Sequence, residues 1–169
     1  MRAAAPAAAL ACAVALFGLA GALGAGAAAA PVTLPQVMDW AGKTLTGVDD
    51  WPLLGFDARG LTLASPVGAT LRPNGLVEGD IRQEFFEPVE LDGLILRSTS
   101  GRWSVDCAHQ RYAVLRLSLF ARNDLKAPLG ERAPAEPVWL ARDAMAGPVI
   151  DGLCEAVKNG VPVVPPPPS

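Results

Sequence analysis

The stretch from Asp106 to His109 holds the side chains best suited to chemistry. It places an aspartate, a cysteine and the only histidine of the chain within four positions, and Cys154 follows later in the sequence. A thiol beside an imidazole is the arrangement of a cysteine nucleophile activated by a base. Together with Cys154, the same side chains could instead supply three metal ligands. In the third alternative, Cys107 and Cys154 form a disulfide and His109 takes no part in a reaction.

Cys107 ends a stretch whose alternation is typical of a β-strand with one buried face. Trp103 and Val105 share a face with Cys107, whereas Arg102 and Asp106 point to the opposite face. We expect the first face to lie in the core and the second in solvent.

A turn at residues 108–110 separates this strand from the next. The second strand places Ala113, Leu115, Leu117 and Leu119 on one face. Because His109 lies in the turn, we expect its ring to lie outside the core. This position separates the imidazole from the buried Cys107 side chain and weakens the nucleophile interpretation.

Cys154 lies in a segment predicted to be helical. Asp143 is suited to cap it, Pro148 is tolerated in a first turn, and the sequence KNG at residues 158–160 is a typical helix end. One apolar stripe runs along this helix at spacings of three and four residues: Ile150, Leu153, Cys154 and Val157. We expect this stripe to cover the sheet.

The two patterns point Cys107 and Cys154 at the same interface. We therefore predict a Cys107–Cys154 disulfide in an exported protein. Such a bond closes a loop of nearly fifty residues, which is worth about 4 kcal/mol in the chain-entropy model. A metal site or a catalytic Cys107/His109 pair remains a less favoured alternative, and we expect no catalytic, metal or cofactor residues.

The first thirty residues have the composition of a secretory signal. Arg2 precedes an uncharged run with the apolar stretch Leu10–Leu23 and small residues at Ala25 and Ala27. We expect cleavage near Ala27, which leaves no membrane segment and places the protein in the periplasm or at the cell surface. An uncleaved anchor and a lipidated Cys12 are the alternatives.

The rest of the chain is predicted to form one α+β domain at residues 51–160. Its short apolar runs alternate with turn residues, which favours a single antiparallel sheet of about five to six strands with the C-terminal helix packed on one face. We expect breaks at residues 88–93 and 98–101 and a loop at residues 125–137. Residues 31–50 form an N-terminal lead-in with at most one helical turn at residues 36–41, and residues 161–169 form a proline-rich disordered tail.

Charge and motifs restrict the classes of function. The formal net charge is −3 and no long basic run occurs, which argues against nucleic acid as a partner. Acids cluster at residues 78–92 and bases at residues 97–126, a pattern that indicates cross-strand pairing or, alternatively, a two-signed partner surface. The sequence has no HExxH, Gly-x-Ser-x-Gly or phosphate-loop motif. Trp51 and Trp139 are candidate interface residues.

Three segments resemble the surface-adhesin protein E family of small exported bacterial proteins. They are WSVDCAHQRYAVLRLSLF at residues 103–120, PVWL at residues 137–140 and VIDGLCEAV at residues 149–157. The similarity extends over about Trp51 to Val157. It implies an antiparallel sheet with one packed helix and bridged cysteines, with Cys107, Cys154 and Trp139 as the matching structural positions. The family's activity implies binding to an extracellular protein.

We therefore expect an exported, non-catalytic binding or accessory protein of the bacterial cell envelope. Its partner would be another protein, at the surface or within the envelope. The alternative is a structural or oligomeric periplasmic protein, including a homodimer. An enzyme or metal-binding protein that uses Cys107 and His109 is the least favoured alternative.

Overall fold

The computed structural model of this chain describes residues 33–65 and 68–160. The predicted signal, the proline-rich tail and residues 66–67 lie outside the described residues. The elements follow the order α1 (Leu34–Thr44), β1 (Leu53–Phe56), β2 (Gly60–Ala64), β3 (Thr70–Leu71), β4 (Val77–Leu91), β5 (Leu94–Asp106), β6 (Arg111–Arg122), β7 (Lys126–Arg132), β8 (Leu140–Ala141) and α2 (Gly147–Lys158).

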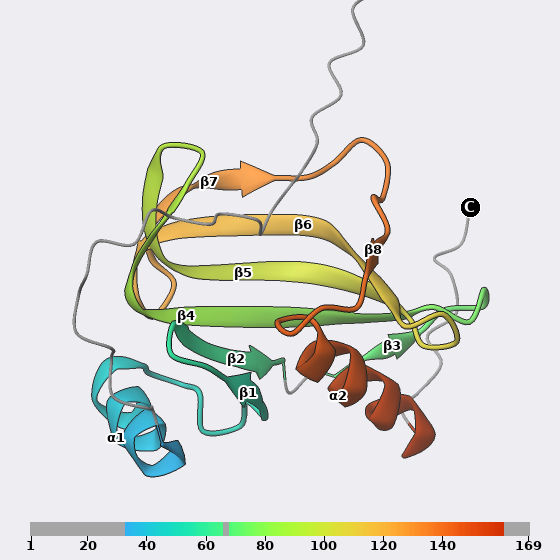
Figure 1. The fold of residues 1–169 in the computed structure, drawn as a ribbon, viewed down its shortest axis with the longest axis horizontal. Coiled ribbons are helices and arrows are strands. Elements are labelled where there is room, and N and C mark those ends of the chain that lie inside the picture. Colours follow the sequence, from blue (N-terminus) through green and yellow to red (C-terminus); the bar gives the residue numbers. More distant parts are fainter. Residues whose placement is uncertain (1–32, 66–67, 161–169) are drawn as a thin grey trace, which may run out of the picture.

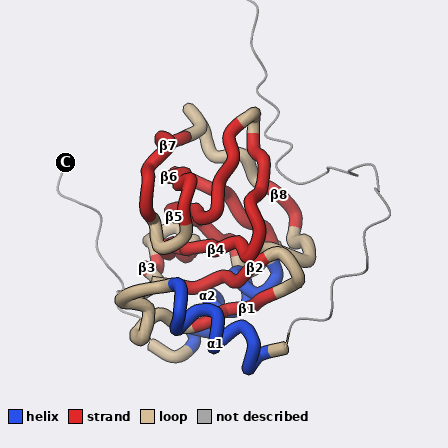
Figure 2. Tube along the Cα trace, turned by 90° about the vertical axis from the view of Figure 1, so that its left-hand side faces the viewer, coloured by secondary structure: helices blue, strands red, loops and turns tan. Residues whose placement is uncertain are grey.

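All described strands belong to one antiparallel sheet that is strongly curled (Figures 1 and 2). The order is β1-β2-β4-β5-β6-β7, with β3 paired to β4 and β8 paired to β6. The α+β class and the C-terminal helix on one face are therefore confirmed. The described sheet has eight strands, so the predicted count of five to six was too small.

Three segments that were expected to interrupt the sheet contribute to its strands. The break predicted at residues 88–93 is absent, because a register shift between Glu84 and Val89 lets β4 continue to Leu91. The turn predicted at residues 98–101 is the middle of β5, where both neighbours supply ladder partners. The predicted loop at residues 125–137 contains β7, an edge strand that pairs with β6 over Leu117–Arg122. Proline is tolerated on such an edge.

The long β4–β5 hairpin turns at Asp92 and Gly93. Both residues have positive φ values, 49° and 77°. A two-residue turn with positive φ at both positions matches the twist of the flanking strands, and Asp-Gly is among the sequences that favour it. The Asp92-Gly93 dipeptide is therefore a hairpin signal that lies inside the segment expected to be a break.

Helix α2 packs on one face of the sheet. Its residues Val149, Ile150 and Leu153 are buried against a group from β4, β5 and β6 that includes Val77, Ile81, Trp103, Val105 and Tyr112. The Trp103 and Tyr112 rings stack with their centroids 5.0 Å apart. Leu153 packs directly on Gly79 of β4. A Cβ at position 79 would collide with a Leu153 methyl group, so glycine permits this close contact. The predicted apolar stripe of α2 is confirmed.

Helix α1 packs on the opposite face, against β2. Val37 and Leu45 are buried with Leu61 and Leu63, which alternate along β2 with residues of the α2 face. Gln36 accepts a hydrogen bond from the Thr33 backbone N–H at 2.9 Å at the start of the helix. The segment expected to be a lead-in is therefore an eleven-residue helix with its own buried contacts. The few apolar residues of this helix become buried only because they pack against β2 of the sheet.

Candidate functional site

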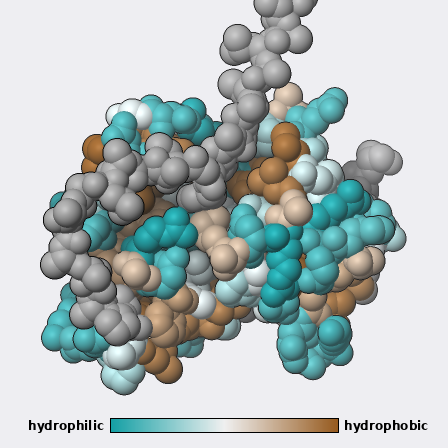
Figure 3. Space-filling model, in the orientation of Figure 1, coloured by the Kyte–Doolittle hydropathy of each residue, from teal (hydrophilic) through white to brown (hydrophobic). Residues whose placement is uncertain are grey.

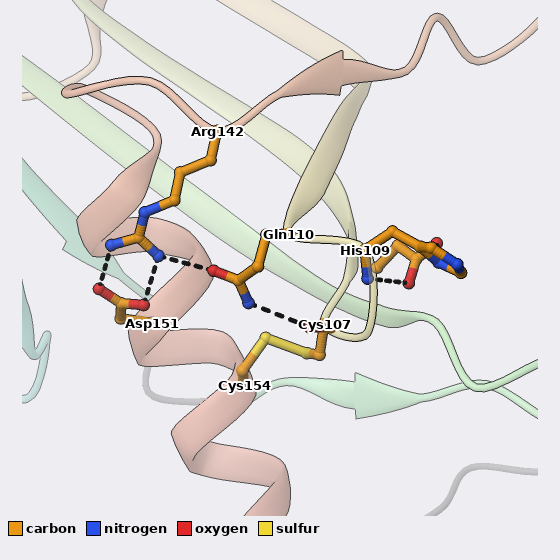
Figure 4. The surroundings of a disulfide bond; sticks show 7 residues. Cys107, His109, Gln110, Arg142, Asp151 and Cys154 are labelled. Atoms are coloured by element: carbon orange, nitrogen blue, oxygen red, sulfur yellow. Dashed lines mark hydrogen bonds and ion pairs between the residues drawn. A yellow bond between two sulfur atoms is a disulfide. The ribbon is translucent and has the colours of Figure 1, made fainter.

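The structure joins the two cysteines that the sequence placed at one interface. Cys107 and Cys154 form a disulfide with a Cα–Cα distance of 5.8 Å (Figure 4). The bond connects the end of β5 to the third turn of α2, and the prediction is confirmed. Disulfides persist mainly in oxidising compartments, so this bond suggests that the protein resides outside the cytoplasm.

The turn after β5 is attached to α2 by polar contacts as well. The Arg142 guanidinium donates to both Asp151 carboxylate oxygens at 2.6 and 2.7 Å and to Gln110 Oε1 at 2.8 Å. Gln110 Nε2 in turn donates to the Cys107 carbonyl oxygen at 3.0 Å, as Figure 4 shows. These contacts and the disulfide hold the strand end, the loop before α2 and the helix as one unit.

His109 interacts with Asp106 and points away from the disulfide in Figure 4. Its Nδ1 lies 2.8 Å from Asp106 Oδ2, and the same carboxylate accepts a 2.9 Å hydrogen bond from Arg111 Nε. The His109 side chain is 71% exposed, but the Asp106 side chain is only 11% exposed. The expectation of a solvated Asp106 was wrong, because His109 and Arg111 cover it.

The contacts of Asp106 determine the direction of its pKa shift. Partial burial acts to raise the pKa of this carboxyl, but hydrogen bonds from His109 and Arg111 outweigh burial and lower it. The carboxylate therefore stays ionised and fixes the turn. In this structure Cys107 carries no thiol for His109 to activate, so the nucleophile interpretation requires a reduced Cys107.

The described part of the chain lacks both a cluster of metal ligands and a helix suited to a membrane. Within residues 33–65 and 68–160, no group of three or more His, Cys, Asp or Glu side chains is arranged to hold a metal ion. In the same residues, no helix has the length and apolar character that crossing a membrane requires.

The concave side of the sheet carries a groove of about 410 Å³ beside α2. It extends from the start of α2 to the β4–β5 hairpin, on the face where Figure 3 shows apolar side chains among polar ones. The larger apolar residues of its lining come from the sheet and from the segment before and at the start of α2: Phe56, Leu61, Phe85, Val89, Leu91, Leu96, Trp103, Val114, Leu117, Leu140, Met145 and Pro148. Concave apolar sites of 300–1,000 Å³ are the usual form of small-molecule sites.

Sequence reasoning missed this groove. Its lining residues come from separate elements between Gly55 and Pro148. They share a surface only because the sheet curls and α2 covers part of it. From the alternation along its strand, each of these apolar residues is predicted only to lie in the core, and a groove is not predicted. Trp103 was assigned to the core, and it is both buried there and a lining residue.

The opposite face of the sheet holds a buried ion network that the sequence also did not reveal. Arg82 donates to Glu84 Oε1 at 2.7 Å and to Asp124 Oδ1 at 3.0 Å. The Thr46 backbone N–H and hydroxyl donate to Asp124 at 2.9 and 2.6 Å. Glu84 is fully buried, and Asn123 donates to its carboxylate at 3.0 Å. The network fastens the loop after α1 to β4 and to the β6–β7 turn.

The two carboxyl groups of this network have opposite pKa shifts. Burial raises the pKa of Glu84, and its hydrogen bonds to Asn123 and Arg82 only partly oppose that effect. Burial also acts to raise the pKa of Asp124, but hydrogen bonds from Thr46, Lys126 and Arg82 outweigh it and lower the pKa far below its usual range. On the α2 face, burial and the nearby Asp143 raise the pKa of the Tyr112 hydroxyl to about 12.

The two tryptophans predicted as interface residues are both half-buried. Trp51 packs in the α1 cluster, and the Arg82 guanidinium lies 6.0 Å from its ring centroid. Trp139 precedes β8, and the Arg111 guanidinium lies 4.9 Å from its ring centroid. These contacts give each indole an intramolecular neighbour, and its role at an interface stays a prediction.

The predicted cross-strand neutralisation occurs between the acidic β4 and the basic β5. Arg102 donates to Glu78 at 3.4 Å and to Asp80 at 3.0 Å. Arg72 also forms an ion pair with Glu78. These pairs account for part of the two-signed charge pattern within a single sheet.

Three comparisons with known proteins were made. No protein-family model matches the sequence, no curated protein matches it, and no solved structure matches the fold. The resemblance to surface-adhesin protein E therefore stays a prediction.

Proposed function

We propose that this chain is an exported, non-catalytic binding protein of the bacterial cell envelope. Its ligand would occupy the groove on the concave side of the sheet. The observation that carries the proposal is the groove itself, an apolar site of about 410 Å³ between the sheet and α2.

The Cys107–Cys154 disulfide supports both parts of the proposal. It fits an oxidising compartment, and it fastens the helix whose first turn borders the groove. The composition of residues 1–30 supports export. A site bordered by a fastened helix is pre-organised, which reduces the ordering cost of binding.

Fluorescence titration with diphenylhexatriene tests the site. This pure hydrocarbon becomes fluorescent in apolar surroundings, and we expect it to bind one site per oxidised chain. Val114→Phe places a larger side chain in the groove and should weaken binding at least tenfold. Val138→Phe is the matched control, because Val138 is 48% exposed and lies outside the groove lining.

Two results would count against the proposal. One is the absence of saturable binding to the folded, oxidised protein. The other is equal binding by wild type and Val114→Phe, provided that circular dichroism and thermal melting show both proteins to be folded. Loss of binding in Val138→Phe as well would show that the probe detects general exposure of the core.

A further inference from the structure

The floor of the groove contains a row of polar side chains that cross three strands. Thr62 of β2 pairs with Gln83 of β4, and Gln83 pairs with Thr99 of β5. Paired residues of neighbouring strands point to the same face of a sheet. All three line the groove, where most of their neighbours are apolar. A polar row at this depth requires hydrogen-bond partners.

Gln83 has only part of the partners that its amide needs. Its Oε1 accepts a hydrogen bond from the Thr99 hydroxyl at 3.3 Å. Among the described residues, Gln83 Nε2 and the Thr62 hydroxyl have no hydrogen-bond partner. Gln83 is 8% exposed and Thr99 is 4% exposed. In the part of the chain that the structure describes, the fully buried side-chain atom without a partner is Ser104 Oγ, so the unpaired Gln83 Nε2 keeps some exposed surface. If the amide oxygen and nitrogen were exchanged, one end of the group would still lack a partner.

The charged groups at the rim restrict the ligand further. Asp57, Glu90 and Asp92 line the groove, and Arg59 is the only basic residue among the described residues that line it. The Arg59 guanidinium donates to Asp57 Oδ2 at 3.1 and 3.2 Å, and Arg132 forms an ion pair with Asp92 at 3.5 Å, so both arginines are already paired. An anionic ligand would meet the unpaired Glu90 carboxylate and, among the described lining residues, no unpaired cation. The electrostatics of the site therefore disfavour carboxylate or phosphate ligands.

We infer that the groove binds a neutral, apolar small molecule with a single amide, carbonyl or hydroxyl group, and that Gln83 hydrogen-bonds this group. The apolar walls accept the hydrocarbon part, and the unpaired end of the Gln83 amide recognises the polar group. The inference rests on the proposed function, since it names the ligand class of the same groove.

Displacement of bound diphenylhexatriene tests the ligand class. The competitors are decanamide and decanoate at pH 7.5, which share a chain length and differ in the charge of the head group. We expect wild type to bind decanamide at least fivefold more tightly than decanoate. Gln83→Met removes the amide but keeps an unbranched side chain, and it should weaken decanamide binding about five- to tenfold, the loss expected for one hydrogen bond.

The hydrocarbon probe separates this inference from the proposed function. In Gln83→Met, the affinity for decanamide should fall relative to the affinity for diphenylhexatriene, because only decanamide makes a hydrogen bond. Equal affinity for decanamide and decanoate in wild type would overturn the inference, and so would unchanged decanamide binding in Gln83→Met. Either result would leave the proposed function standing if the probe itself binds and Val114→Phe blocks it.

Thr99→Val provides a second test that does not depend on the folding of Gln83→Met. It removes the hydroxyl that orients the Gln83 amide and keeps the β-branched shape. We expect the affinity for decanamide to fall about two- to fivefold relative to the affinity for diphenylhexatriene. Parallel losses for both molecules would show a general change in the groove and would contradict the role assigned to Gln83.

Discussion

Two of the clusters of arginine and carboxylate in the sheet differ in nearly every physical respect. Asp106 meets Arg111 and His109 within a single turn, and His109 and Arg111 remain open to solvent. Arg82, Glu84 and Asp124 meet across forty-two positions of sequence and are almost completely buried. The first cluster is local and shapes a turn. The second joins distant segments and holds the α1 side of the molecule together.

The same contrast distinguishes the two faces of the sheet. The α1 side has the buried ion network, in which each carboxylate accepts hydrogen bonds from several donors. The α2 side has an apolar groove whose one buried amide lacks a full set of partners. A buried network of paired charges indicates a structural role, whereas an apolar groove lined by a polar side chain with an unpaired donor indicates a place for a ligand. This difference is the reason that the candidate site is assigned to the α2 side.

Removal of the shared cation of the buried cluster should have the largest effect. Arg82→Met leaves Glu84 and Asp124 as buried carboxylates without their guanidinium, and we expect a loss of about 3–5 kcal/mol in the free energy of unfolding. Urea denaturation measures this loss. Arg116→Met is the control, because the Arg116 side chain is 58% exposed and its ion pair with Glu131 is long, 3.9 Å. Equal losses in both variants would contradict the comparison.

Removal of the disulfide should rank second. Cys107→Ser with Cys154→Ser is expected to lower the free energy of unfolding by about 2–4 kcal/mol, because the unfolded chain regains a long loop. Reduced wild type should show the same loss, and this agreement is the control. The oxidised protein and the double variant can be compared by urea denaturation. Equal stability of the two would show that the polar contacts of Arg142 suffice to fix α2.

Acid should affect the buried cluster through Asp124. Its pKa is lowered in the folded protein, so its stabilisation is complete above the unfolded pKa of about 3.9 and is lost as the pH falls through the folded pKa. We therefore expect the stability of wild type to fall below about pH 4. Asp124→Asn should flatten this fall more than Asp106→Asn does. Thermal melting between pH 7 and pH 2 measures both slopes, and the reverse order would be inconsistent with the account.

The local cluster of Asp106, His109 and Arg111 should give the smallest effect. At pH 7, Asp106→Asn keeps the size of the side chain and weakens its contacts with His109 and Arg111, and we expect a smaller loss of stability than in either of the first two variants above, because both partners are open to solvent. Diphenylhexatriene binding should not change, because Asp106 does not line the groove. A loss as large as that of Arg82→Met would show that the turn has a structural importance equal to that of the buried network.

Much of the α2 side could be predicted from the sequence because its signals are local. The period-two pattern at Trp103 and Val105 and the helical stripe at Leu153 each define a buried face within one element. Two such faces in an exported chain were sufficient to predict the Cys107–Cys154 bond. The helix end at Lys158 follows from the same local chemistry.

The rest depends on contacts between distant segments. Pro88 predicted a break, but the partners of β5 and a register shift keep β4 continuous. The edge position of β7 accommodates Pro128, which alone would argue against a strand. Arg82 and Glu84 alternate as though they faced solvent, and only the Asp124 turn and the α1 loop bury them. The groove depends on sheet curvature, which no short pattern in this chain specifies.

The most direct test of the central claim is intact-mass measurement of the protein recovered from the extracytoplasmic fraction of bacterial cells that express the whole chain. The account predicts a chain shortened at its amino end near Ala27, with no free thiol and a Cys107–Cys154 cross-linked peptide after digestion. It also predicts that this material binds diphenylhexatriene in the groove. A full-length chain confined to the cytoplasm with the Cys107 and Cys154 thiols free, or an oxidised exported chain without saturable binding, would contradict it.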